Sequence, residues 1–491
     1  MVKEKNKKEG GFKMSKGKVK KFFITGIAFA TLGLLGVVPN LEAGTITDSN
    51  ATTLSTFTVA KEVVEAGTSE NPVEVNVGNK ITGIDYKPTD IPLGALSDPT
   101  VSFKLSAGKW IVNNTNLQVC SRDGEVIAEY EGGNETHTLV FSGSGTTLAN
   151  DVKYYIGYNN GTNNCTALPP DALGLTVPPG TSTITLTVNA GTAATQVIHD
   201  TASGTLIEVK PQYSAEVSKE LDAEIDYEED FKKLYDEGRS TENDNGTVTI
   251  KYENLNWGVN NTTTDDNEIV TVVLEPSDIS GISKVQIDPD FGSNYTTNCT
   301  KDEDNQKFTC TYNATDITGN KEATLKVIVD GTTVLAERDF KVDVSLDFKD
   351  DEAKDENLLV DEDFGAWTYR GTAIYVPLIG VDPSTGRETY IKLQSKDTSP
   401  NANKVRAIIL ASDGTLVTAD IGQITAGQPF VITGSDLKAK VEAAGKSVED
   451  SFAAILVVTT SEENLFGYAN IIDPNGAKRV PLKVKDGEIV E

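Results

Sequence analysis

Hydrophobic and polar residues alternate along much of the chain. In Thr100–Leu105 and Thr183–Val188 apolar side chains occupy every second position, which is the pattern of a strand with one buried face. Turn-forming stretches such as Gly132–Asn134 and Pro178–Gly180 separate runs of this kind. Short alternating strands divided by frequent turns are typical of sandwiches or barrels. The pattern therefore predicts a mostly β fold.

Changes in composition along the 491 residues predict several domains. Residues 211–244 fit either edge strands or a charged helix, and the sequence leaves that choice open. A short helix is expected at Asp436–Ala444, with Ser435 as its N-cap and Gly445 after its end. We expect a signal peptide over 1–43, a flexible lead-in over 44–70, a β-sandwich domain over 71–210, an acidic connector over 211–244, a second β-sandwich over 245–346, an acidic linker over 347–363, and a mostly β domain with the short helix over 364–491.

The first 43 residues have the three parts of a secretory signal. Four lysines between Lys16 and Lys21 precede the apolar run Phe22–Val38, and small Ala43 marks the expected cleavage site. An uncleaved anchor is the alternative, because a run of 17 residues is at the short limit of a membrane span. We expect cleavage, secretion to the cell surface, and no membrane span in the mature chain.

The four cysteines of an exported protein predict two disulfides. Cys299 and Cys310 flank a polar stretch that resembles a turn, so they are suited to bridge one hairpin. Cys120 and Cys165 would then pair over a longer loop. This is the most local of three possible pairings, and a four-thiolate metal site lacks the usual C-x-x-C spacing.

Acidic residues dominate one part of the chain. The net charge is −29 overall and −35 after removal of the signal, which disfavours nucleic acid as a partner. Residues 44–363 carry −33 of this charge, whereas 364–491 hold 13 basic and 15 acidic residues. One hypothesis is that the acidic part faces the environment, while the nearly neutral part packs against neighbouring subunits or the cell envelope.

All Asn-x-Thr sequons precede residue 314 and are candidate glycosylation sites. The alternative is that Asn and Thr are simply frequent in turn-rich β domains. The candidates are Asn50, Asn113, Asn134, Asn160, Asn164, Asn245, Asn260, Asn261, Asn294, Asn298 and Asn313.

Candidate chemistry is sparse. Asp288, Asp290 and Asn294 place oxygen ligands at alternate positions around a glycine, as a calcium loop requires, although the stretch also fits an ordinary turn. His137 and His199 have no partner at ligand spacing, and the common catalytic motifs are absent from the sequence. We therefore predict no catalytic residue, no enzyme activity, and no cofactor other than calcium.

Two stretches, Ser277–Val285 and Ala314–Asn320, resemble bacterial Ig-like domains, and the resemblance covers about residues 245–346. It implies a β-sandwich and no particular activity. The predicted fold class is thus multi-domain and mostly β, with Ig-like or β-sandwich domains joined by acidic linkers.

The composition is similar to that of S-layer proteins, being acidic, rich in Thr and Gly, and poor in His, Met and Cys. This resemblance implies an exported, non-enzymatic structural protein of the cell surface that forms a homo-oligomer or lattice at the envelope. An adhesin or extracellular filament subunit is one alternative, and a secreted hydrolase with Ig-like accessory domains is another. Paired carboxylates of a glycosidase would be compatible with the last.

Overall fold

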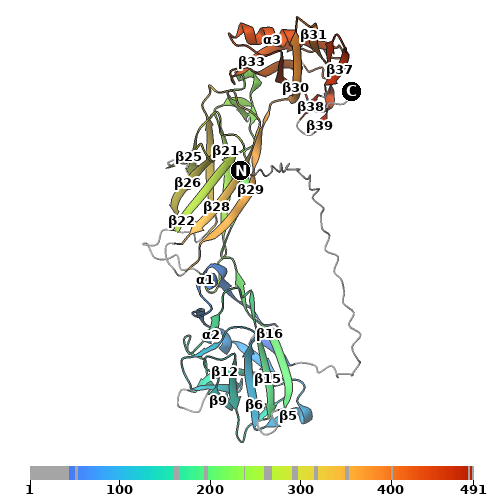
Figure 1. Ribbon diagram of the computed structural model, residues 1–491. Helices are drawn as coiled ribbons and strands as arrows, with labels where there is room; N and C mark the ends of the chain where they lie inside the picture. Colours follow the sequence, from blue (N-terminus) through green and yellow to red (C-terminus); the bar gives the residue numbers. More distant parts are fainter. Residues whose placement is uncertain are drawn as a thin grey trace, which may run out of the picture. The chain divides into compact units, whose positions relative to one another are not determined.

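Strands make up most of the chain in the computed structural model (Figure 1). Three hydrophobic cores organise them. We call the surrounding parts the first module (44–210), the middle module (211–370) and the C-terminal module (371–488). The expected mostly β, multi-domain fold class is confirmed. The predicted signal peptide lies outside the described residues, which are 44–49, 53–159, 165–192, 197–236, 238–258, 268–289, 297–314, 319–348, 353–399, 402–480, 482–484 and 487–488.

The first module is built on one large sheet whose inward side chains form its core. In β6 (Pro99–Leu105), Val101, Phe103 and Leu105 are buried, as the alternation predicted. The other strands of this sheet are β1 (Thr45–Asp48), β4 (Ile84–Lys87), β12 (Tyr154–Asn159), β8 (Leu117–Ser121), β9 (Val126–Gly132), β10 (Thr138–Ser142), β15 (Thr183–Thr192), β16 (Ile198–Lys210), β2 (Phe57–Ala60) and β13 (Cys165–Thr166). Smaller elements complete the module: β3 (Val73–Asn76), β14 (Leu173–Val177), β7 (Trp110–Val112), β11 (Thr147–Ala149), β5 (Ala95–Ser97), α1 (Lys61–Ala66), α2 (Gly78–Thr82) and the 3-10 turn η1 (Pro92–Gly94).

The expectation of a flexible lead-in over 44–70 is wrong. This segment contains β1, β2 and α1, and Ile46, Val59 and Val64 are buried in the first core. β1 pairs with β4, and β2 pairs with the end of β16. These partners are distant in sequence, so the local Thr- and Ser-rich composition did not reveal them.

Two sheets enclose the core of the middle module. The first contains β17 (Tyr213–Lys219), β21 (Asn243–Tyr252), β27 (Lys321–Val329), β23 (Ile282–Asp288) and β24 (Thr297–Asn298). The second contains β20 (Arg239–Thr241), β19 (Leu234–Asp236), β18 (Glu224–Ile225), β29 (Glu356–Tyr369), β28 (Arg338–Asp347), β22 (Glu268–Pro276), β26 (Lys307–Ala314) and β25 (Thr300–Asp302). The stretch from Ser277 leads into β23, and the stretch ending at Asn320 precedes β27.

Both expected acidic connectors are instead parts of the middle module. Residues 211–244 form β17–β20, the 3-10 turn η2 (Tyr227–Glu229) and the start of β21, which resolves the open choice in favour of strands. Residues 356–363 begin β29, which continues past Phe364 to Tyr369. The expected boundary at residue 364 therefore falls inside one strand. The sequence suggested a boundary there because the acidic residues lie along the exposed first half of β29 and its buried residues begin only at Phe364.

A buried hydrogen bond joins the two sheets of the middle module. The indole Nε1 of Trp367 in β29 donates to Asp244 Oδ2 in β21 over 2.7 Å, and both residues are fully buried. Asp244 also accepts from the backbone N–H groups of Ala223 and Asn245. Burial raises the pKa of Asp244, although these three donors act in the opposite direction.

The C-terminal module has its own core, and α3 (Gly434–Ala443) buries Leu437 and Val441 against it. The helix begins earlier than expected, because Thr433 rather than Ser435 caps it by accepting a hydrogen bond from the N–H of Asp436. Its strands are β33 (Leu416–Gln423), β32 (Lys404–Leu410), β35 (Ser451–Val458), β30 (Thr372–Asp382), β31 (Arg387–Ser395), β36 (Leu465–Asp473), β37 (Gly476–Val480), β34 (Phe430–Thr433), β38 (Lys483–Val484) and β39 (Gly487–Glu488), and η3 (Glu462–Asn464) precedes β36.

Both predicted disulfides are present. Cys299–Cys310 closes an 11-residue separation beside the β25–β26 ladder, and Cys120–Cys165 closes one of 45 residues. The second bridge joins β8 to β13 past the intervening strand β12 at Gly157. A Cβ atom at Gly157 would lie 2.8 Å from Cys120 Sγ, so this position needs glycine because the disulfide passes close to its backbone.

We expect Gly157→Val to prevent or strain the Cys120–Cys165 bridge and to lower the free energy of unfolding by up to about 4 kcal/mol, the value for a loop of this length. Thiol titration and urea unfolding of the full chain measure the two effects. Gly132→Val in β9 is the matched control, since nothing lies within 4 Å of a Cβ atom there. Equal stability of the two variants would show that Gly157 does not serve the bridge.

Candidate functional site

The residues predicted to bind calcium are not gathered into a described metal site. Asp288 is buried at the end of β23, while Asp290 and Asn294 lie outside the described residues. Among the residues that the structure describes, no three His, Cys, Asp or Glu side chains are grouped so that they could hold a metal ion. Calcium binding stays a prediction.

Five of the candidate glycosylation sites are described, and none of these asparagines is buried. They are Asn113, Asn134, Asn245, Asn298 and Asn313; the other six, Asn50, Asn160, Asn164, Asn260, Asn261 and Asn294, fall outside the described residues. Some carry structural hydrogen bonds, such as Val112 N–H to Asn134 Oδ1. Their glycosylation also stays a prediction.

The two histidines do not share a site. His137 precedes β10 and His199 lies in β16, and β6 and β15 separate these two strands in the sheet.

Within the described ranges, none of the helices has the length and apolar character needed to cross a bilayer.

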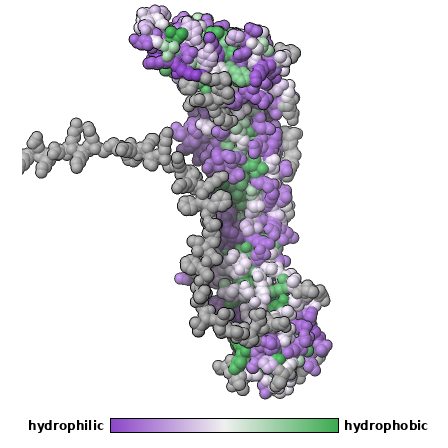
Figure 2. Space-filling model, turned by 90° about the vertical axis from the view of Figure 1, so that its right-hand side faces the viewer, coloured by the Kyte–Doolittle hydropathy of each residue, from purple (hydrophilic) through white to green (hydrophobic). Residues whose placement is uncertain are grey.

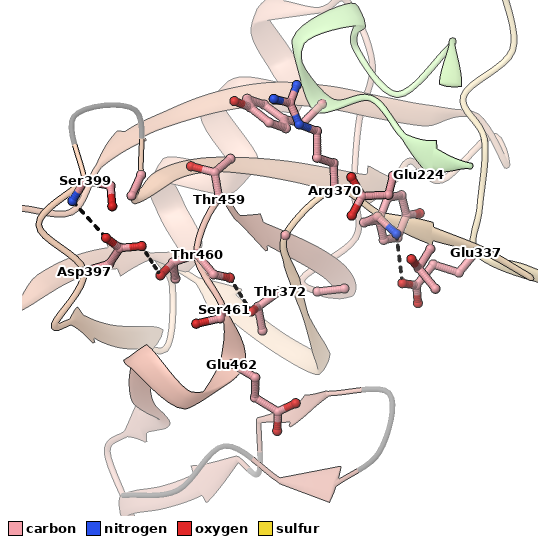
Figure 3. A pocket seen from close by; sticks show the side chains of 16 residues that line it. Glu224, Glu337, Arg370, Thr372, Asp397, Ser399, Thr459, Thr460, Ser461 and Glu462 are labelled. Carbon is pink, nitrogen blue, oxygen red and sulfur yellow. Dashed lines mark hydrogen bonds between the residues drawn. The ribbon is translucent and has the colours of Figure 1, made fainter. Parts of the chain in front are cut away.

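A cavity of about 630 Å³ lies where the middle and C-terminal modules meet (Figure 3). The chain passes through it at Arg370–Thr372, between the end of β29 and the start of β30. Polar and apolar surface contribute about equally to its lining, and the polar part includes carboxylates from both modules and a row of hydroxyl groups. The charged and hydroxyl side chains are Glu224, Glu337, Arg370, Thr372, Asp397, Ser399, Thr459, Thr460, Ser461 and Glu462.

Arg370 is the cation of this cavity. Its Nη1 atom lies 3.6 Å from Asp226 Oδ1 and 3.6 Å from Glu228 Oε2, and its guanidinium lies 3.5 Å from the centre of the Tyr235 ring. Asp226 is fully buried and also caps η2 by accepting from the N–H of Glu228. Arg370 therefore balances charge in a segment where acidic residues are crowded.

A second set of contacts, made by residues of β32, joins the C-terminal module to the same acidic segment of the middle module. Lys404 Nζ lies 3.4 Å from Glu228 Oε1, and Arg406 forms an ion pair with Asp230 and donates to the carbonyl of Tyr227. Burial opposes the ionisation of Glu228, but hydrogen bonds from Tyr227 and Lys404 lower its pKa. Basic residues of the C-terminal module thus bind the acidic η2 turn of the middle module.

Two carboxylates of the cavity, Glu337 and Asp397, form hydrogen bonds within the fold. Glu337 accepts from the N–H of Tyr369 over 3.1 Å and from the hydroxyl of Tyr375. Burial, followed by this hydrogen bond, raises the pKa of Tyr375, so its hydroxyl stays protonated as a donor. Asp397 accepts from Ser399 N–H and from Thr460 Oγ1. These groups hold chain segments together, and the arrangement serves as a structural joint.

A buried carboxylate marks the joint between the first and middle modules. Glu62 in α1 is 1% exposed and accepts from the N–H groups of Gln212 and Tyr213 at 3.0 and 3.2 Å. The carbonyl of Glu62 accepts from Lys354 N–H, and Lys61 pairs with Glu356 over 2.9 Å. One turn of helix thus binds the start of β17 and the approach to β29. Burial raises the pKa of Glu62.

Sequence reasoning missed both joints. The acidic run at 226–230 was visible, but its partners Arg370 and Arg406 are more than 130 positions away in the chain. A single basic residue within a balanced composition gives no signal by itself. An isolated Glu in the short apolar pattern around Val59–Val64 was the only local sign of the other joint.

A family model described as S-layer protein Slr4 matches residues 100–479 of this chain. Comparison with curated proteins gives no match.

Among solved structures, the C-terminal domain of the Streptococcus agalactiae AgI/II polypeptide BspA is 11% identical, covering 66% of this chain and 99% of that one, with a TM-score of 0.22. The Bacillus cereus major pilin subunit BcpA is 12% identical, covering 78% and 91%, with a TM-score of 0.20. The C-terminal domain of the Streptococcus pyogenes protein AspA is 9% identical, covering 67% and 100%, with a TM-score of 0.22. No inference about this chain rests on such low scores.

We expect Glu62→Gln to keep the joint, because a single amide oxygen can accept from both N–H groups, and to change the pH dependence of stability. The raised pKa means that the folded state holds the proton more tightly, so the Glu62 contribution to the free energy of unfolding falls as pH rises from about 4.5 through the raised value. The Gln variant loses this decline.

Glu62→Ala leaves both donors without that acceptor and should cost about 1–3 kcal/mol. Urea unfolding between pH 4 and 8 measures both variants, with the exposed Glu74→Gln as a control for charge. A pH profile identical to that of the unmodified chain for Glu62→Gln would contradict the assignment.

Proposed function

The chain belongs to the S-layer protein Slr4 family, and we propose that it forms a surface lattice in which the C-terminal module contacts neighbouring subunits. Family membership identifies it as a secreted structural protein of the cell surface. The observation that carries the proposal is the match over residues 100–479, which spans parts of all three modules.

The distribution of charge supports the assignment of subunit contacts to the C-terminal module. Residues 44–363 carry a net charge of −33, and residues 364–491 carry −2. Equal copies of a strongly acidic surface repel one another, and this repulsion extends over a Debye length of about 8–10 Å. Hydrophilic residues also predominate on the face in Figure 2, where hydrophobic ones form small, separate groups. Close contact between subunits is therefore easier through the nearly neutral module.

The proposal assigns the chain a mechanical role without catalysis. It is supported by the structural nature of the family and by the use of Glu337, Asp397 and Arg370 as contacts within the fold. Joints that bind neighbouring modules suit a subunit that must keep its dimensions in an array. An adhesin or filament subunit is the second candidate, and electron microscopy separates them, because a lattice subunit forms sheets and a filament subunit forms fibres.

A chain that ends at Arg370 should fold its first two modules but fail to form a lattice or remain on the cell. This end point keeps Trp367 and Tyr369 in the middle core, unlike a cut at residue 364, although it removes Ala373, Ile408 and Val457 from the same cluster. Negative-stain microscopy of the purified protein and cell fractionation measure the result, and circular dichroism with a count of free thiols checks the fold. Normal lattices from the truncated chain would refute the role of the C-terminal module.

We also propose that calcium binds the stretch from Asp288, the last residue of β23, to Asn294, with Asp288, Asp290 and Asn294 as oxygen ligands. Chelator should then lower the melting temperature, and added calcium should restore it by binding to the folded state. The double variant Asp288→Asn, Asp290→Asn should lose this response. A melting temperature that chelator leaves unchanged would remove calcium from the proposal.

A further inference from the structure

A groove of about 480 Å³ lies on the outer face of the C-terminal module, over β31, β36 and β37. Two aromatic rings, two amides and two cations line it. These side chains are Lys392, Gln394, Phe466, Tyr468, Asn470 and Arg479. We call this surface the aromatic–cationic groove.

Strand alternation explains why these residues share one face. Ile391 and Leu393 of β31, with Ala469 of β36, are buried in the core, so the residues between them point outward. Lys392 lies opposite Tyr468, and Asn470 lies opposite Arg479 in the antiparallel ladders. The groove is thus built on regular strands, where its side chains have a fixed spacing.

The two cations of the groove, and Lys396 next to it, lie near its rings. Lys392 Nζ is 5.7 Å and Arg479 Cζ is 5.9 Å from the centre of the Tyr468 ring, and Lys396 Nζ is 4.3 Å from the centre of the Phe466 ring. Within the described part of the chain, no carboxylate forms an ion pair with Lys392 or Lys396. The groove therefore offers positive charge above apolar ring surface, a pairing that fits an acidic segment carrying an apolar side chain.

The same chain presents such a segment on β29. Val360 is 66% exposed, and Asp361, Glu362 and Asp363 beside it are all exposed. The ladder to β28 changes register here, and Asp361 has a φ of 53°, so the strand forms a bulge. The pairing with β18 begins only at Thr368, so this first half of β29 has no partner strand on that side within the described residues. We call residues 360–363 the acidic bulge.

We propose that the aromatic–cationic groove of one subunit binds the acidic bulge of a second copy. The inference rests on the proposed lattice function and names one contact within it, which joins copies into rows; a second contact between rows completes a sheet. The two surfaces differ, so the interface is heterologous, and a bound pair keeps one free groove on one copy and one free bulge on the other, to which further copies can add. Val360 would contact the rings, while Asp361 and Glu362 meet the cations at the edge; Asp363 pairs with Lys341 of its own chain over 2.7 Å. Such exposed charge pairs make the contact sensitive to salt.

Charge reversal in the full-length chain tests the contact from both sides. The groove variant is Lys392→Glu, Arg479→Glu, and the bulge variant is Asp361→Lys, Glu362→Lys. Each variant on its own should raise the critical concentration for assembly about tenfold or more, because groove and bulge then carry charge of the same sign. A mixture of the two should assemble, because the reversed groove fits the reversed bulge and the unchanged surfaces fit each other. Light scattering and electron microscopy measure assembly, and circular dichroism confirms folding.

The control is Lys104→Glu, Lys109→Glu, which makes the same change in net charge at exposed positions of the first module. Assembly of the groove variant at the control's concentration would overturn the inference and leave the lattice function standing through another surface. Failure of the mixture to assemble would exclude the bulge as the partner.

If the groove variant assembles normally but no longer binds an acidic polysaccharide that the unmodified chain binds, the inference is overturned and the groove has a glycan partner instead. Absence of any lattice from the unmodified chain would refute the proposed function itself, which distinguishes the two failures.

Discussion

The hydrogen bond between Trp367 and Asp244 connects the two sheets of the middle module at its centre. A buried carboxylate without partners would be strongly destabilising, and here the indole and two backbone N–H groups supply its donors. The ring of Trp367 also meets Phe340 edge to face, with 4.9 Å between the ring centres. Because Trp367 lies near the end of β29, this arrangement fixes where the strand leaves the core and where the C-terminal module begins.

Both ends of the middle module use charge to bind a neighbour. At one end, a single buried carboxylate, Glu62, accepts from the first backbone N–H groups of the module. At the other, Lys404 and Arg406 of the C-terminal module pair with Glu228 and Asp230 in the acidic turn. Such contacts are specific because an unpaired partner would carry a desolvation cost. Hydrophobic contact alone would join the modules with less directional preference.

The acidic bulge on β29 has two compatible physical roles. Charges and a bulge on an exposed strand edge prevent uncontrolled pairing with other strands. The same features make the edge selective, since only a surface with suitable cations and apolar area can cover it. A protein that must assemble in one way and avoid others needs both properties.

Local patterns in the sequence determined the mostly β fold, strands such as β6 and β15, the two disulfides and the contrast in charge. Alternation has a period of two whatever the partner strand is, so it can be read without knowing the fold. The Ig-like stretches likewise lead into β23 and β27. Only the tertiary structure decided what the acidic segments 211–244 and 347–363 become, because their core residues are buried by strands distant in sequence. It also decided that Arg370 meets Asp226, and that Lys392 and Arg479 share one groove, since these positions become neighbours only when separate strands pair.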